Sequence, residues 1–369
     1  MCNEIYQTER RFYLKRKVLL VLGLSVTLAC TNAVSVYAAG GGNHRIETYS
    51  NNNKKVVAAG DIELNITGDV SVTGNGEIAV KTSEDAKVSV KGNVSVNGSG
   101  TTGVESTDNS SANVSGDITA EGQSALGIKA GKGASVTVDG AVKANGQLAV
   151  GINSEGEATA GDVLVKGSDS TGVLASNNGK ITINNDVKVV ESDRRSDSGP
   201  VSGVETESNG KVTVKGNVEV DGIGAMGINS TQGVVNVNGN VKVSGTPQNN
   251  QNEETVGISA KGSNISVKGN VASDGKGIHI IKSGTGLNSI VEVNGSVTGS
   301  SGVVTNNGSD VTVGGDVTAT GGTGLDITME EATGRGKINL GTLNVTKEGE
   351  TGVLLDVRKR NIQAGSYTH

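Results

Sequence analysis

Two polar inserts carry the residues best suited to binding chemistry. Residues 191–202 read ESDRRSDSGPVS, residues 246–255 read TPQNNQNEET, and each insert holds one of the chain's two prolines. Arginine forms strong charge-assisted hydrogen bonds with acidic groups, while amides and carboxylates orient a partner. The sequence therefore predicts a partner-binding patch, which consists of Asp193, Arg194, Arg195, Asp197, Asn249, Asn250, Asn252, Glu253 and Glu254. The alternative interpretation is two tolerated surface insertions, because loops generally accept changes of length.

Residues suited to catalysis or metal binding are few. The histidines are His44, His279 and His369, no two of which are spaced as a metal pair. A serine nucleophile needs an oriented base, and His279 is the one candidate for that base within the repeats. Both cysteines, Cys2 and Cys30, precede the expected end of an export leader. We therefore expect no catalytic residue, no metal and no cofactor.

Two further motifs receive a structural interpretation. Residues 222–227 (GIGAMG) have the letters of a dinucleotide-binding fingerprint, but they precede a strand, so a phosphate would meet no helix N-terminus. Asp and Asn recur at one corner of the repeat, where their tolerance of left-handed turns and their bonds to their own backbone explain the residue type. A calcium ladder is the alternative, but the Gly-Gly-x-Gly-x-Asp nonapeptide does not occur.

A repeat of short strands must position all of these residues. Residues 211–230 read KVTVKGNVEVDGIGAMGINS, which contains three apolar runs separated by glycine-rich corners. The aliphatic residue after each corner recurs every 20 to 31 residues, at Val70, Val94, Ile118, Val142, Val163, Val187, Val218, Val241, Val271, Val297, Val317 and Leu343. Such a period without helical patterning predicts an all-β fold, a right-handed parallel β-helix (β-solenoid) of about twelve three-strand coils.

Composition agrees with a narrow aliphatic core. The chain has 57 glycines, two prolines, no tryptophan and one phenylalanine. A globular core filled with aromatic residues is excluded, yet valine and isoleucine recur too regularly for a disordered chain. A third run in each coil carries a Gly-aliphatic pair such as Gly227-Ile228, where the glycine implies a close approach that a side chain would obstruct.

The N-terminus reads as an export leader. Basic residues are followed by an apolar stretch (residues 18–29) and by small residues that end in Val36-Tyr37-Ala38-Ala39, which predicts a signal peptide over residues 1–38 with cleavage between Ala38 and Ala39. A membrane anchor, a lipoprotein box at Cys30 and a twin-arginine signal at Arg10-Arg11 remain alternatives. Residues 39–57 are a flexible lead-in, residues 58–357 the β-helix, and residues 358–369 an irregular tail.

Charge narrows the class of partner. Removal of the leader leaves 27 basic and 36 acidic residues. A net negative rod disfavours nucleic acid and anionic membranes as partners.

The coils resemble a known family. Residues 87–106 (KVSVKGNVSVNGSGTTGVES) and 211–230 are similar to the passenger region of pertactin-like autotransporters, the secreted adhesins of Gram-negative envelopes. The resemblance covers the leader and residues 58–357. It implies export through the periplasm to the cell surface or the medium, and a C-terminal outer-membrane β-barrel. The residues after Val357 (RKRNIQAGSYTH) show no alternation typical of barrel strands, so we expect no barrel within this sequence.

The resemblance implies an exported, non-enzymatic, adhesin-like rod that binds a host surface protein, matrix or glycan. Two alternatives stay open, a β-helical polysaccharide lyase or hydrolase and a structural stalk or truncated passenger remnant. The enzyme alternative is disfavoured because sugar clefts commonly carry aromatic platforms, and no aromatic residue lies between Ser50 and Ser366.

Overall fold

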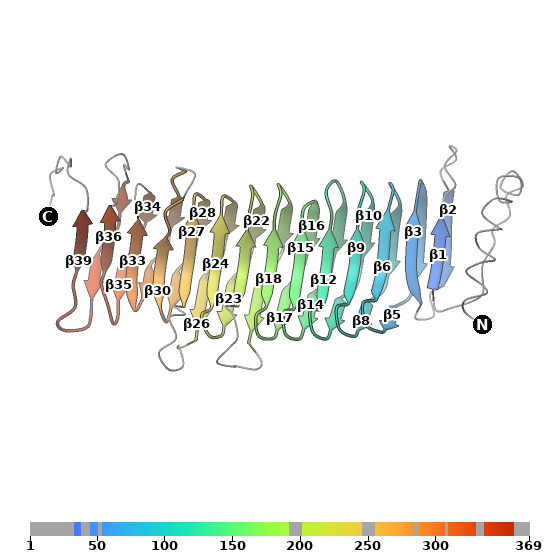
Figure 1. The fold of residues 1–369 in the computed structure, drawn as a ribbon, viewed down its shortest axis with the longest axis horizontal. Helices are drawn as coiled ribbons and strands as arrows, with labels where there is room; N and C mark the ends of the chain where they lie inside the picture. The colour runs from blue at the N-terminus through green and yellow to red at the C-terminus, as the bar shows by residue number, and fades with distance from the viewer. Residues whose placement is uncertain are drawn as a thin grey trace, which may run out of the picture.

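The computed structural model describes residues 33–37, 45–50, 54–191, 201–245, 255–283, 287–306, 309–329 and 336–357. Every secondary-structure element in these ranges is a β-strand, and the strands form three parallel sheets. Each coil from β3 to β38 contributes one strand to each sheet, and successive coils stack along one axis from β1 to β39 (Figure 1). The chain is thus a parallel β-helix, as the repeat predicts.

Sheet A has 14 strands, and from Gly103 onward the Gly-aliphatic pairs lie within or directly at the start of its strands. Its strands are β1 (Ala33–Tyr37), β3 (Lys55–Ala59), β6 (Ile78–Ser83), β9 (Thr102–Ser106), β12 (Leu126–Ala130), β15 (Val150–Ser154), β18 (Thr171–Ala175), β21 (Ser202–Thr206), β24 (Met226–Thr231), β27 (Val256–Lys261), β30 (Lys276–Ile280), β33 (Ser301–Asn306), β36 (Leu325–Met329) and β39 (Val353–Val357).

Sheet B has 13 strands, which precede the Asp- and Asn-rich corner. Its strands are β2 (Arg45–Ser50), β4 (Ile62–Thr67), β7 (Lys87–Lys91), β10 (Ser111–Val114), β13 (Ser135–Val138), β16 (Glu157–Ala160), β19 (Lys180–Ile183), β22 (Lys211–Val214), β25 (Val234–Val237), β28 (Asn264–Val267), β31 (Ile290–Val293), β34 (Asp310–Val313) and β37 (Ile338–Asn339).

Sheet C has 12 strands, which follow that corner. Its strands are β5 (Val70–Thr73), β8 (Val94–Asn97), β11 (Ile118–Glu121), β14 (Val142–Asn145), β17 (Val163–Lys166), β20 (Val187–Val190), β23 (Val218–Asp221), β26 (Val241–Ser244), β29 (Val271–Ser273), β32 (Val297–Gly299), β35 (Val317–Ala319) and β38 (Leu343–Val345). All twelve begin at an aliphatic residue that the repeat singles out, so the predicted register is confirmed.

The core is a column of aliphatic side chains between the three sheets. In the central coil, Val214 from sheet B, Val218 from sheet C and Ile228 from sheet A are each 0% exposed. Alternate residues such as Thr213 and Glu219 point outward and are partly exposed. Because the side-chain period of a strand is two, this alternation fixes which face of each sheet is buried.

Glycine in the third strand is required by packing. A Cβ atom at Gly227 would lie 2.5 Å from Cγ1 of Val241 and 2.6 Å from the carbonyl oxygen of Gly257 in the next coil. These separations are far below van der Waals contact, so the strand approaches its neighbours more closely than any side chain permits. The predicted close approach is confirmed.

Two strands lie before the expected start of the solenoid. β1 falls within the predicted leader and pairs with β3 in parallel, while β2 falls within the predicted lead-in and pairs with β4. The sequence of β2 (RIETYS) shows no alternation of apolar and polar residues, and Ile46 is 63% exposed. Its pairing therefore depends on the strand edge that β4 provides. The tail at residues 358–369 lies outside the described residues.

Candidate functional site

The predicted patch lies in two segments outside the described residues. Asp193, Arg194, Arg195 and Asp197 fall within residues 192–200, and Asn249, Asn250, Asn252, Glu253 and Glu254 fall within residues 246–254. The strands at their bases are described: the first insert connects β20 to β21, and the second connects β26 to β27. Both therefore join sheet C to sheet A, and in sheet C only β23 lies between the two strands from which they leave. Binding by these nine residues stays a prediction.

Glu191 fixes the base of the first insert. At the same corner, neighbouring coils have glycines with positive φ, namely Gly146 and Gly167. Glu191 is instead 5% exposed, and its Oε2 accepts the backbone N–H of Ile223 in the next coil at 2.6 Å. A buried carboxylate that accepts a backbone N–H is stabilised by that charge-assisted bond. Glu191 thus holds the chain against the rod where the insert departs.

A hollow lies on sheet C near the corner where its strands begin, at the opposite end of β20 and β26 from the two inserts. It has a volume of about 310 Å³ and is bordered by three successive strands, β20, β23 and β26. Its lining residues are Asp186, Val187, Lys188, Asn217, Val218, Glu219, Asn240 and Lys242. Two of these three strands, β20 and β26, lead into the inserts, so the hollow lies on the same coils as the strands from which the inserts leave.

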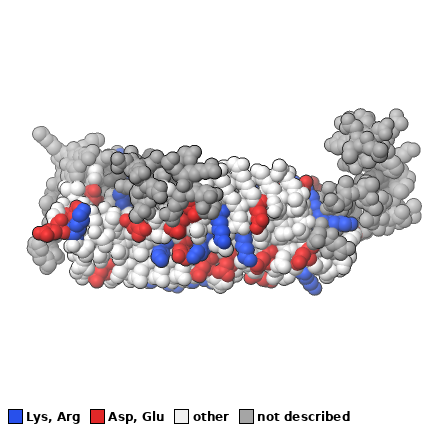
Figure 2. All heavy atoms as spheres, turned by 90° about the horizontal axis from the view of Figure 1, so that it is seen from below, with Lys and Arg blue, Asp and Glu red and all other residues white. Residues whose placement is uncertain are grey.

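Charged side chains alternate along the hollow. Nζ of Lys188 lies 2.9 Å from Oε2 of Glu219, and the two side chains are 48% and 43% exposed. Lys242 follows Glu219 in the adjacent strand, because Glu219 pairs with Lys242 in the register of β23 and β26. Figure 2, which shows the rod from below, likewise has blue lysine and arginine atoms next to red carboxylates. The hollow therefore offers both signs of charge to a polar ligand.

The Asp- and Asn-rich corner forms a ladder between coils. Oδ1 of Asn217 accepts the backbone N–H of Asn240 at 2.9 Å, and Oδ1 of Asn240 accepts that of Asn270 at 2.8 Å. The same bond recurs in eight further pairs, in each of which a side-chain oxygen of the first residue accepts the backbone N–H of the second. The pairs are Asp69 and Asn93, Asn93 and Asp117, Asp117 and Ala141, Asp162 and Asp186, Asp186 and Asn217, Asn270 and Ser296, Ser296 and Asp316, and Asp316 and Thr342. The side chains thus bond the next coil rather than their own backbone.

The expectation of left-handed geometry at this corner is wrong. No corner residue of the ladder has a positive φ. The non-glycine residues with positive φ include Asp108, Asn109, Ser208 and Asn209, which lie at the different corner that connects sheet A to sheet B. Ala141 has no side-chain acceptor, so the ladder is interrupted before Asp162. Asp and Asn occur at this corner because each must accept an N–H bond from the coil above.

The neighbouring carboxylates Asp162 and Asp186 are ladder members. Each accepts a backbone N–H through Oδ1, and Asn185 also donates to Oδ2 of Asp162 at 3.1 Å. Within the described ranges, no three His, Cys, Asp or Glu side chains are arranged to hold a metal ion. The ladder therefore accounts for this pair without a ligand.

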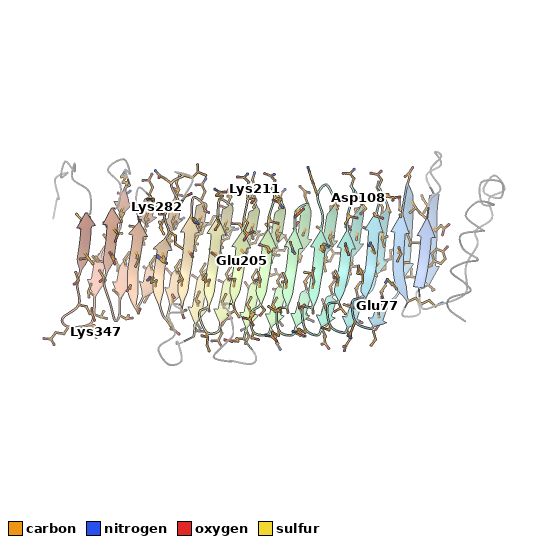
Figure 3. All side chains as sticks on the ribbon, viewed as in Figure 1. Glu77, Asp108, Glu205, Lys211, Lys282 and Lys347 are labelled. Atoms are coloured by element: carbon orange, nitrogen blue, oxygen red, sulfur yellow. The ribbon has the colours of Figure 1, made fainter. Side chains whose placement is uncertain are left out.

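The outer face of sheet A carries a second polar column. Glu205 lies near the middle of this face (Figure 3), where Ser202 and Asn229 donate hydrogen bonds to its carboxylate. Burial raises the pKa of Glu205, and the charge of Glu207 adds to this effect. Two coils further along, the register places Ser259 opposite His279. Ser259 is 5% exposed, so the pair offers no accessible nucleophile.

The lysines of the hollow were missed in the sequence, although a signal exists. Lys188 and Lys242 each stand one position after a strand-starting valine, as does Lys143. Alignment of the coils on those valines would have placed the three lysines in one column. The signal cleavage residues Ala38 and Ala39 lie outside the described part of the chain.

Comparisons of the chain with family models, curated proteins and solved structures found no match. Among the described residues, no helix is long and apolar enough to cross a membrane.

Proposed function

We propose that this chain is an exported, non-enzymatic adhesin, a rod of the autotransporter passenger type that binds a host surface protein, matrix or glycan. One observation carries the proposal: the hollow on sheet C is bordered by β20, β23 and β26, and the two long inserts follow the first and the last of these strands. A uniform rod offers a partner few distinguishing features, so recognition needs a landmark of this kind.

The repeats fit the proposed family and other β-helices with the same coil. The Gly-Asn corner and the Gly-aliphatic pair, which carry the resemblance to pertactin-like passengers, are structural requirements of the solenoid, as Asn217 and Gly227 illustrate. The same requirements apply to any β-helix with this coil, so the leader and the inserts are what favour the adhesin within that class. We therefore propose export through the periplasm to the cell surface or the medium.

Among the described residues, the engagement of the neighbouring corner carboxylates Asp162 and Asp186 favours binding over catalysis. Glycoside hydrolysis needs two carboxylates that flank the scissile bond. Among the described residues, Asp162 and Asp186 are the adjacent corner carboxylates, and both are engaged by backbone N–H groups of the ladder. A polysaccharide-degrading activity has no comparable support from these residues.

The test removes the inserts and keeps the coils. Excision of residues 193–197 and 248–253 should abolish binding of the purified rod to cultured host cells and matrix, while the β-rich circular dichroism spectrum and melting temperature stay unchanged. Excision of residues 284–286, between β30 and β31, is the matched control at another corner. Unchanged binding after the double excision would leave the inserts as tolerated surface loops.

A further inference from the structure

Three lysines form a column on the outer face of sheet C. The register joins Lys143 to Leu164, Leu164 to Lys188, Lys188 to Glu219 and Glu219 to Lys242 across β14, β17, β20, β23 and β26. A lysine therefore recurs at every second coil. Because adjacent parallel strands lie about 4.8 Å apart, neighbouring lysines of the column are about 9.6 Å apart along the rod axis.

The lysines are accessible and only lightly engaged. Lys143 lies 2.7 Å from Oδ2 of Asp117, with the two side chains 39% and 40% exposed. Lys188 pairs with Glu219 at similar exposure. Lys242 is exposed and makes no ion pair within the described residues. Exposed ion pairs contribute little stability, so an incoming anion can exchange with Asp117 or Glu219 at small cost.

The coils between the lysines do not favour anions. Leu164 is apolar, and Glu219 would repel a negative group that faced it. At the edge of the face, Asp162 and Asp186 add negative charge. An acidic group is therefore favoured opposite alternate coils only, and a neutral, hydroxyl-bearing group is favoured opposite the coil of Glu219, whose carboxylate accepts hydrogen bonds.

We propose that the face of sheet C from β14 to β26 binds a linear acidic polysaccharide that carries one carboxylate on every second sugar and lies along the rod axis. A pyranose unit in an extended chain is about as long as one coil is high, so alternate sugars meet alternate coils. The acidic sugars face Lys143, Lys188 and Lys242, and the hollow receives the sugar between the last two. The inference rests on the proposed adhesive function and names the ligand class of that function.

The alternating charge supplies selectivity. A polysaccharide with a carboxylate on every sugar would place one against Glu219, and a neutral chain would gain nothing from the lysines. Single-stranded nucleic acid is a polyanion whose charges do not alternate with neutral sugars. Both chains therefore serve as probes that separate periodic recognition from general attraction to positive charge.

The test is titration calorimetry of the whole exported rod with a hyaluronan decasaccharide, in which glucuronate alternates with a neutral sugar. Replacement of both Lys188 and Lys242 (Lys188→Gln, Lys242→Gln) should weaken binding by about tenfold or more, because charge-assisted contacts are the strong ones. The matched control is the double variant Lys180→Gln, Lys211→Gln, which removes two lysines that are neighbours on sheet B. It has the same net charge as the Lys188→Gln, Lys242→Gln variant. Glu219→Gln should strengthen binding by freeing Lys188. Each effect should shrink as salt rises from about 50 to about 200 mM.

Three results would overturn the inference: no binding of the decasaccharide, an equal loss in the sheet B control, or equal binding of oligogalacturonate or single-stranded DNA. The experiment separates this inference from the adhesive function. If the decasaccharide does not bind, or binds without Lys188 and Lys242, while cell binding needs the inserts, the glycan site is wrong and the adhesin stands. If the lysine-dependent glycan binding is present but the rod binds no cells or matrix, the site stands and the adhesive function is wrong.

Discussion

The side chain of Asn217 bonds the coil above it: its Oδ1 accepts the backbone N–H of Asn240 at 2.9 Å. A parallel sheet pairs strands, but the corner between sheets B and C has backbone N–H groups that the strand ladders do not reach. The corner side chain supplies the acceptor. The stacking of coils is therefore stabilised at the corner as well as in the sheets.

Replacement of this side chain tests the ladder. Asn217→Ala should lower the free energy of unfolding by about 1 kcal/mol, because the bond is lost and water can partly replace it at an exposed corner. Asn217→Ser is the control, because it keeps an acceptor of the kind that Ser296 provides in the same ladder and adds no charge beside Asp186. Chemical denaturation of both variants measures the difference, and equal stability of the Ala and Ser variants would contradict a contribution from the bond.

Close packing around Gly227 gives a larger effect. Gly227→Ala places a methyl group 2.5 Å from Val241 and 2.6 Å from the Gly257 carbonyl, so the stack must shift. Overpacking of this kind costs about 1 to 3 kcal/mol or more. A methyl group at Gly352 would meet no atom within 4 Å, so Gly352→Ala is the matched control. A melting temperature for Gly227→Ala equal to that of the control would contradict the packing argument.

The register of the core has its own test. Val218 is 0% exposed, so Val218→Asp buries a carboxylate without a partner and should destabilise the solenoid by several kcal/mol, on the order of 3 to 5. Thr213 points outward from sheet B, and Thr213→Asp should change stability by less than about 0.5 kcal/mol. Urea denaturation of the two variants decides the matter, since similar losses would place Val218 and Thr213 on equivalent faces.

Much of the fold can be predicted from the sequence, because the same packing constraints recur from coil to coil. Glycine before an aliphatic residue is forced by the close approach at Gly227, and valine after the corner is forced by burial at Val218. The role of Asn217 is not legible, since its partner is Asn240 in the next coil and not its own turn. β2 also escapes prediction, because its pairing comes from the exposed edge of β4 rather than from its own pattern.

The candidate site was predictable only in part. The inserts stand out as breaks in the repeat, and the strands at their bases lie where the repeat places them. The hollow and the lysine column depend on which residues of separate coils become neighbours. That relationship follows from the register of Lys188 with Glu219 and of Glu219 with Lys242, which requires coils of unequal length to be aligned.

Export processing gives a prediction at the N-terminus. Cleavage between Ala38 and Ala39 would remove β1 and leave β3 as the first strand of sheet A. Mass spectrometry of the exported protein should therefore find an N-terminus at Ala39 or within a few residues of it. An N-terminus before Ala33 would show instead that β1 stays in the rod, and retention of residues 1–17 would rule out leader removal.

The pH dependence of stability tests the environment of Glu205. Burial raises its pKa above the ordinary value of 4.5, so the folded state holds this proton more tightly than the unfolded state does. Between 4.5 and the pKa in the folded state, the folded chain binds more protons, and the contribution of Glu205 to stability falls as pH rises. The contribution is fully present below 4.5 and is lost above the pKa of the folded state.

Glu205→Gln removes the titration while it keeps an acceptor for Ser202 and Asn229. The free energy of unfolding of this variant should no longer fall as pH rises above 4.5. At pH 7 it should therefore exceed the free energy of unfolding of the unchanged protein. Glu207→Gln is the control, because the charge of Glu207 is the smallest of the causes that act on Glu205, so most of the fall should persist. Urea denaturation across about pH 4 to 8, a window that begins just below the ordinary pKa and extends above it, measures all three proteins. If Glu207→Gln abolished the fall, repulsion between the two carboxylates would be the main cause, and burial of Glu205 on sheet A would not be.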